Sequence, residues 1–231
     1  AGALHINLSE LKDVRWAVAV LATVGVIIAT FVTGTCIWYM AGWLGFDLPY
    51  IYALLFGALI SPTDPIAVLA ILKQAGASRK IYVKTGGESL FNDGVGVVVF
   101  LAILGIATGS SEFSISALAG VFLHEALGGA VLGGLLGWAC YQLLKAINEY
   151  KVELMLTLAL ATGGYALAEY LHLSAPICMV VAGLVIGNHG RARGMSEQTR
   201  LRLDDFWELL DEVLNALLFM LIGFELIIIN L

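Results

Sequence analysis

Three carboxylates interrupt two long apolar segments of this 231-residue chain. Asp64 stands in the run SPTDP of residues 61–65, and Glu88 and Asp93 stand in the run GESLFNDG of residues 87–94. An ionisable side chain at the centre of a bilayer costs about 3 kcal/mol or more, so such residues are rare and mark ion or proton pathways. We therefore expect Asp64, Glu88 and Asp93 to belong to a site for a small cation or a proton.

The prolines beside Asp64 predict the backbone conformation around this residue. Pro62 and Pro65 bracket Thr63 and Asp64, and proline lacks the amide hydrogen that continues a helix. An unwound helix within a bilayer is tolerated only where it is buried in protein or lines a polar cavity. Broken helices in secondary transporters use their freed carbonyls to coordinate cations. The sequence therefore predicts a broken transmembrane helix at Thr63 and Asp64.

Asp64 and Asp93 are expected to lie at a similar depth. Asp64 precedes Lys73 by nine residues, and Asp93 follows Lys84 by nine residues. Both lysines mark the same end of their segments, and nine helical residues span about 13 Å. The two segments are consecutive, antiparallel and joined by a short loop, so we expect the two carboxylates to be neighbours near the bilayer centre.

Hydroxyl and amide side chains complete the expected site. Ser89 and Asp93 are i,i+4 neighbours on one predicted helix, so both can face the cation. Glu88 and Asn92 have the same spacing, so the Asn92 amide can donate to the Glu88 carboxylate. Together with Thr63 and freed carbonyls this makes an all-oxygen shell, which suits a hard monovalent ion such as Na⁺.

Simpler interpretations of the supporting residues remain open at this level. Glu88 also lies i,i+4 from Lys84, which allows an ion pair on the helix surface. Ser89 and Asn92 are also typical of ordinary hydrogen bonds between transmembrane helices.

A second acidic group lies in the last apolar segment. Glu208, Asp211 and Glu212 occur there at helical spacing. They either line an acidic cytoplasmic funnel that concentrates cations or form a solvated lead-in to the membrane.

Composition sets the class of the fold. The chain is 60% hydrophobic and only 13% charged, whereas soluble domains carry about 25% charged residues. We expect an all-α polytopic protein with a single transmembrane domain over residues 1–231, embedded in lipid. No Lys/Arg-rich run is long enough to indicate nucleic-acid binding. Apolar windows predict about seven spans, at roughly 16–43, 50–72, 82–107, 114–144, 152–171, 175–189 and 205–229.

The distribution of basic residues predicts the orientation in the cell membrane. All of them lie before the first span, in alternate loops or at the adjoining end of a span, at Lys12, Arg15, Lys73, Arg79, Lys80, Lys84, Lys145, Lys151, Arg191, Arg193, Arg200 and Arg202. The loops at 44–49, 108–113 and 171–175 carry none. The positive-inside rule therefore places residue 1 on the cytoplasmic side, and an odd number of spans places residue 231 outside.

Glycines in the fourth predicted span favour close helix contact. The span contains Gly128, Gly129, Gly133, Gly134 and Gly137, and three of them, Gly129, Gly133 and Gly137, are spaced four residues apart. Both packing within one protomer and a dimer interface are consistent with this spacing.

The runs SPTDPIAVLAILKQAG and GESLFNDGVGVVVF resemble the monovalent cation/proton antiporter family, which includes bacterial sodium/proton exchangers and animal sodium/hydrogen exchangers. The later runs AGLVIGNHGR and FWELLDEVLNALLFMLIGFEL are similar to the same family. The resemblance implies an inverted-repeat fold with crossing broken helices, a homodimer and alternating access. It also implies that the chain is a central portion of a longer antiporter, without the first and last spans.

The resemblance assigns roles to individual residues. It implies that Asp93 is the carboxylate that exchanges cation and proton, that Ser89, Thr63 and Asp64 are its neighbours, and that Glu88 and Asn92 support the site. The Asn92-Asp93 pair is similar to that of the electroneutral exchangers.

The resulting hypothesis is a secondary transporter, not an enzyme, in which Na⁺ and H⁺ compete at Asp93. It needs no cofactor, and its oxygen ligands are also compatible with Li⁺ or K⁺. A non-transporting fragment of such an antiporter is one alternative. An intramembrane aspartyl protease using Asp64 and Asp93 is another, although the Gly-x-Gly-Asp signature of those enzymes does not occur in the sequence.

Overall fold

The described part of the chain is built from helices joined by short connections. The computed structural model describes residues 2–109, 115–147, 149–190, 195 and 197–228, and no strand occurs among them. Residues 114 and 229, at the ends of two predicted spans, and Arg191 and Arg193 of a basic loop lie outside the described residues. The elements are η1 (Gly2–His5), α1 (Leu8–Val20), η2 (Leu21–Gly25), α2 (Val26–Trp43), α3 (Tyr50–Ile60), α4 (Ile66–Gln74), α5 (Arg79–Ala107), α6 (Ile115–Ala146), α7 (Tyr150–Tyr170), α8 (Ala175–Val185), η3 (Ile186–Gly190) and α10 (Glu197–Ile228).

The first and last helices begin earlier than the predicted spans. α1, η2 and α2 form one helix from Leu8 to Trp43, ahead of the predicted residue 16, and the Asn7 side chain caps its start by accepting from the Ser9 amide at 2.9 Å. α10 starts at Glu197, ahead of the predicted residue 205. Apolar windows find where a helix becomes apolar, whereas the hydrogen-bonded ladder continues through a polar lead-in.

The lengths of the helices identify a membrane protein. Among the described residues, four helices are long and apolar enough to cross a bilayer, at Leu8–Trp43, Arg79–Ala107, Leu123–Ala146 and Tyr150–Tyr170. α3 and the α8–η3 helix are apolar but shorter. The all-α membrane class expected from composition is therefore confirmed, with α3 and α4 as the two halves of one interrupted helix.

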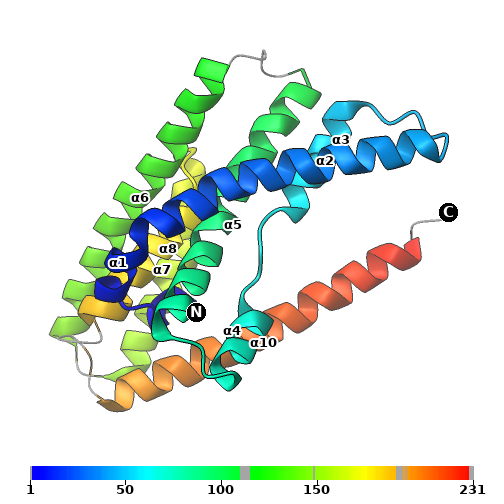
Figure 1. The fold of residues 1–231 in the computed structure, drawn as a ribbon. Helices are drawn as coiled ribbons and strands as arrows, with labels where there is room; N and C mark the ends of the chain where they lie inside the picture. Colours follow the sequence, from blue (N-terminus) through cyan, green and yellow to red (C-terminus); the bar gives the residue numbers. More distant parts are fainter. Residues whose placement is uncertain (1, 110–114, 148, 191–194, 196, 229–231) are drawn as a thin grey trace.

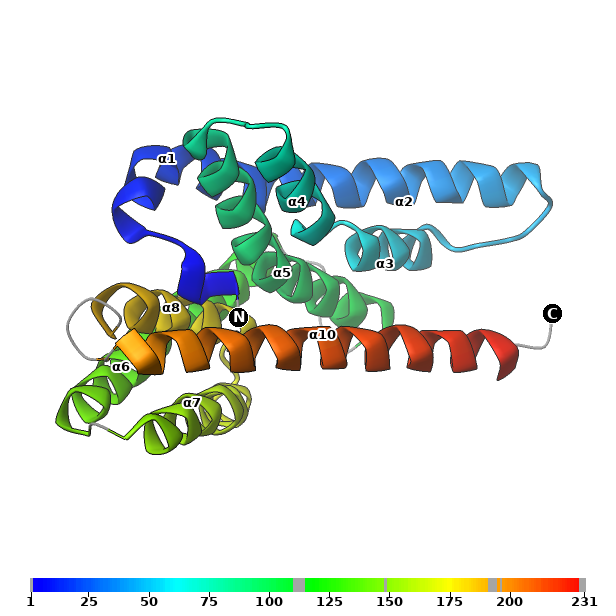
Figure 2. The same cartoon turned by 90° about the horizontal axis from the view of Figure 1, so that it is seen from below.

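α5 joins two groups of helices. α2 and α3 run side by side away from α6, α7 and α8, which gather on the opposite side of the molecule in both views (Figures 1 and 2). α5 contacts α2 and α3 of the first group and α6 and α8 of the second, and it also contacts α1. α10 packs on α7 near its own start and then extends away, so that its far end stands apart in Figure 2. Because α5 carries Glu88 to Asp93, the central helix also carries most of the candidate site.

The glycines of α6 pack against α8 within the protomer. A Cβ at Gly133 would overlap the Cys178 carbonyl oxygen, and a Cβ at Gly137 would lie 2.9 Å from the Cα of Ala182. Such distances leave no room for a larger side chain, so the small residues permit the close approach of α6 and α8. Packing within one protomer, one of the two interpretations of this glycine spacing, therefore accounts for these contacts.

Candidate cation site

The helix that contains Asp64 is interrupted over five residues. α3 ends at Ile60 and α4 begins at Ile66, and residues 61–65 between them are not helical. Because Pro62 and Pro65 have no amide hydrogen, neither can continue the ladder of hydrogen bonds. The predicted break at Thr63 and Asp64 is confirmed, because both residues lie outside α3 and α4.

The break lies directly against α5. A Cβ placed on Gly96 would overlap the Cγ atom of the Pro62 ring and lie 3.2 Å from its Cδ atom. Glycine at this position therefore lets the interrupted segment approach the α5 backbone, which brings Thr63 within reach of the polar side chains one to two turns earlier on α5.

A buried asparagine connects the break to α5. The Asn92 amide nitrogen donates to Thr63 Oγ1 at 2.8 Å and to Glu88 Oε1 at 2.8 Å. Thr63 Oγ1 also lies 3.3 Å from Ser89 Oγ. Asn92 is fully buried and Ser89 nearly so. These bonds place four of the predicted site residues, Thr63, Glu88, Ser89 and Asn92, in one network.

Glu88 is oriented toward the break. Besides the Asn92 amide, its carboxylate accepts longer contacts of 3.4 Å from the hydroxyls of Thr63 and Ser89. No ion pair between Glu88 and Lys84 occurs in the part of the chain that the structure describes. The side chain thus faces the predicted site, and it accepts the hydrogen bond from Asn92 that their i,i+4 spacing predicted.

The carboxylates of Asp64 and Asp93 line one cavity. This cavity of about 330 Å³ is bounded by the break, α5 and the start of the chain, and Ser89 also lines it. Asp93 interacts electrostatically with Asp64 and with Glu88. Two carboxylates and a hydroxyl around one space can supply oxygen ligands to a monovalent cation or hold a proton.

One member of the predicted acidic funnel reaches the same cavity. Asp211 of α10 lines it together with Asp64 and Asp93. Glu208 and Glu212, the other two members, are not among its lining residues. Glu212, the next residue on α10, faces a different part of the helix surface, because residues one apart on a helix do not face each other.

Residues that the sequence did not single out also belong to this region. Arg79 lines the cavity and its Nε donates to Glu10 Oε2 at 2.9 Å. Thr30 of α2 lies 3.1 Å from Ser61 at the start of the break. Ser61 could have been noticed, since it opens the run SPTDP, but a threonine within an apolar helix carries no signal in the sequence.

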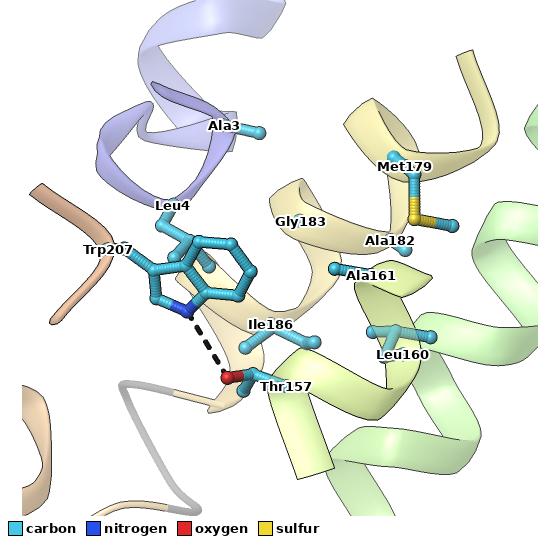
Figure 3. Close-up of a pocket in the computed structure, with 10 residues that line it drawn as sticks. All are labelled: Ala3, Leu4, Thr157, Leu160, Ala161, Met179, Ala182, Gly183, Ile186 and Trp207. Atoms are coloured by element: carbon cyan, nitrogen blue, oxygen red, sulfur yellow. Dashed lines mark hydrogen bonds between the residues drawn. The ribbon is translucent and has the colours of Figure 1, made fainter. Parts of the chain in front are cut away.

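A second cavity has a different character. It measures about 110 Å³ between η1, α7, α8 and α10, and its lining is mainly apolar, with Leu4, Leu160, Met179 and Ile186 (Figure 3). Trp207 covers one side and donates from Nε1 to Thr157 Oγ1 at 3.2 Å (Figure 3). Among the described residues no carboxylate lines this cavity, so it supplies no charged ligand for a cation. It lies where α10 packs against α7.

The broken helix, its hydrogen bond to the buried Asn92 side chain and the carboxylate-lined cavity are features that occur together in ion-coupled membrane transporters. The chain belongs to the sodium/hydrogen exchanger family, because the family model described as "Sodium/hydrogen exchanger, transmembrane" matches residues 1–230.

Individual relatives agree with this family. The chain is 57% identical over 228 residues to the Na⁺/H⁺ antiporter NhaP of Pseudomonas aeruginosa, covering 99% of this chain and 54% of that protein. It is 39% identical over 233 residues to the Na⁺/H⁺ antiporter NhaH of Halobacillus dabanensis, covering 96% of this chain and 55% of that protein. The chain therefore spans about half the length of the curated relatives it matches.

A solved structure shares the fold. The electron-microscopy structure of the sodium proton antiporter MjNhaP1 from Methanocaldococcus jannaschii superposes with a TM-score of 0.64 at 24% identity, over 88% of this chain and 49% of that chain. The arrangement of α1 to α10 thus matches about half of the fold of that chain.

Proposed function

We propose that this chain forms the cation site of a secondary active antiporter that exchanges Na⁺ for H⁺. The observation that carries the proposal is the Asn92 bridge, which fixes the break at Thr63 to α5 beside a cavity lined by Asp64 and Asp93. Relatives that match almost the whole chain are named Na⁺/H⁺ antiporters, which supports the choice of ions. The chemistry is ion translocation, without a cofactor and without a covalent step.

Competition at one site explains coupling. Asp93 binds either a proton or, when ionised, a cation, with Asp64, Ser89 and Thr63 as further oxygen ligands. The site turns from one side of the membrane to the other only when an ion occupies it. Because the cation and the proton never occupy it together, each transport cycle exchanges one ion for the other. Glu88 and Asn92 hold the ligands in place through the network described above.

The wider setting is part of the same proposal. The protein lies in the cell membrane with residue 1 on the cytoplasmic side and residue 231 outside, as the basic loops predict, and it works as a homodimer. Asp211 then lies on the cytoplasmic approach to the site and attracts cations. Li⁺ and K⁺ are compatible with the same oxygen ligands.

The test is the collapse of an imposed pH gradient by added Na⁺ in membrane vesicles. Vesicles that contain the protein should lose the gradient, and the Asp93→Asn variant should not, because an amide can neither release a proton nor supply a negative ligand. Asp47→Asn, the same substitution in the loop after α2, is the matched control and should exchange normally. Sodium-dependent proton flux that persists in Asp93→Asn would overturn the proposal.

A further inference from the structure

We propose that Thr30 is a positioning residue for the cation site and that it acts through Ser61. The inference rests on the proposed antiport, because it assigns a residue to that site. Thr30 is fully buried in α2, and its Oγ1 lies 3.1 Å from Ser61 Oγ at the end of α3. Neither hydroxyl lines the cavity with Asp64 and Asp93, so neither is a ligand.

The direction of this hydrogen bond follows from the partners of Ser61. The Ser61 hydroxyl donates to the Gly57 carbonyl at 2.5 Å, and a hydroxyl has one hydrogen to donate. Thr30 must therefore donate to Ser61. The result is a chain from Thr30 through Ser61 to a carbonyl of the last turn of α3, where backbone acceptors lack amide partners.

The two helices leave little room for this contact to move. A Cβ at Gly57 would overlap the Thr30 carbonyl oxygen, and a Cβ at Gly34 would lie 2.9 Å from the Ala53 carbonyl oxygen. α2 and α3 are thus in backbone contact around the Thr30 hydroxyl. Within a bilayer no water replaces a lost bond at such a place, so the position of Ser61 depends on Thr30.

Ser61 and Thr63 hold the break from opposite sides. Thr63 is tied to α5 by the Asn92 amide, and Ser61 is tied to α2 by Thr30. Two residues of extended chain span at most about 7 Å, so fixing Ser61 restricts where Thr63 and the adjacent Asp64 can lie. Loss of the Thr30 bond loosens the ligand-bearing segment without removing a ligand.

The first experiment compares Thr30→Val, which keeps the shape and removes the hydroxyl, with the wild-type full-length protein in vesicles. We expect the apparent KM for Na⁺ to rise about three- to tenfold, the range that one hydrogen bond supports, at a nearly unchanged maximal rate. Thr30→Ser should restore the KM, because it restores the donor. Ser61→Ala should raise the KM as well, and the double variant should be no worse than the more impaired single variant.

Thr23→Val is the matched control. Thr23 lies in the same long helix and donates to the carbonyl of Ala19 at 2.6 Å, so this substitution removes an equivalent hydroxyl with no partner on α3. It should leave the KM unchanged. A wild-type KM in Thr30→Val, or a KM that Thr30→Ser fails to restore, would overturn the positioning role.

A second measurement is independent of transport. Hydrogen–deuterium exchange of a peptide covering residues 55–70 should be faster in Thr30→Val than in Thr23→Val, because the break is less restrained. Equal exchange rates in the two variants would overturn the inference whatever the protein transports. Absence of Asp93-dependent flux in the wild type would instead contradict the proposed antiport, so the two failures are distinguishable.

Discussion

The amide nitrogen of Asn92 lies 2.8 Å from the hydroxyl oxygen of Thr63, across the contact between α5 and the interrupted helix. The same nitrogen donates to Glu88 at 2.8 Å, and Asn92 is fully buried. One side chain therefore holds both the break and a carboxylate on the preceding turn of α5.

Replacement of Asn92 by Leu should impair the site. The variant keeps the approximate volume but removes the amide that donates to the Thr63 hydroxyl and the Glu88 carboxylate, and a hydrogen bond to a charged group contributes about 1.5–3 kcal/mol. We expect the apparent KM for Na⁺ to rise at least about tenfold and the melting temperature to fall. Gradient collapse in vesicles and a thermal melt of the purified protein check both. Unchanged values in both assays would show that the bridge is dispensable.

Addition of a single methyl group at Gly96 should displace the break. The new Cβ in Gly96→Ala would overlap the Pro62 ring, so the interrupted segment must move away from α5, and overpacking of this kind costs about 1–3 kcal/mol. We expect most of the exchange activity to be lost while the protein still inserts and folds. Gly163→Ala on α7 is the control, since its Cβ would meet nothing within 4 Å. Normal exchange by Gly96→Ala would contradict the close contact.

Removal of the charge of Asp211 should weaken cation recruitment in a salt-dependent way. Asp211 lines the cavity whereas Glu208 does not, so Asp211→Asn should raise the apparent KM for Na⁺ about two- to fivefold at low ionic strength and less at high ionic strength, where salt screens the attraction. Glu208→Gln should have the smaller effect. Equal effects of the two variants would favour a solvated lead-in over a funnel. Initial rates at two concentrations of an impermeant salt measure this difference.

Competition between ions predicts the pH dependence of exchange. Raising the pH on the side from which Na⁺ is added removes the competing proton, so the apparent KM for Na⁺ should fall, by up to about tenfold per pH unit while protonation dominates. The maximal rate at saturating Na⁺ should change little over the same range. A maximal rate that varies with pH at constant KM would indicate separate sites for the two ions. Stopped-flow fluorescence with a pH-sensitive dye provides both parameters.

Patterns within a few residues of the sequence were sufficient to predict much of the candidate site. Pro62 and Pro65 predicted the break because proline excludes a continuous helix whatever surrounds it. The i,i+4 spacing of Glu88 and Asn92 predicted their hydrogen bond, because the period of a helix sets which residues are neighbours. Hydropathy located the helices but not the starts of α1 and α10, because a polar lead-in is invisible to an apolar window.

The sequence by itself determined the membrane class, the broken helix and which carboxylates interrupt the apolar segments, because each depends on features within a few residues along the chain. Only the tertiary structure decided that Asn92 meets Thr63, that Asp211 alone of its acidic group lines the cavity with Asp64 and Asp93, and that Thr30 holds Ser61. Such contacts join residues from different helices. They depend on how helices pack, and here glycines such as Gly57 and Gly96 set how closely the backbones approach.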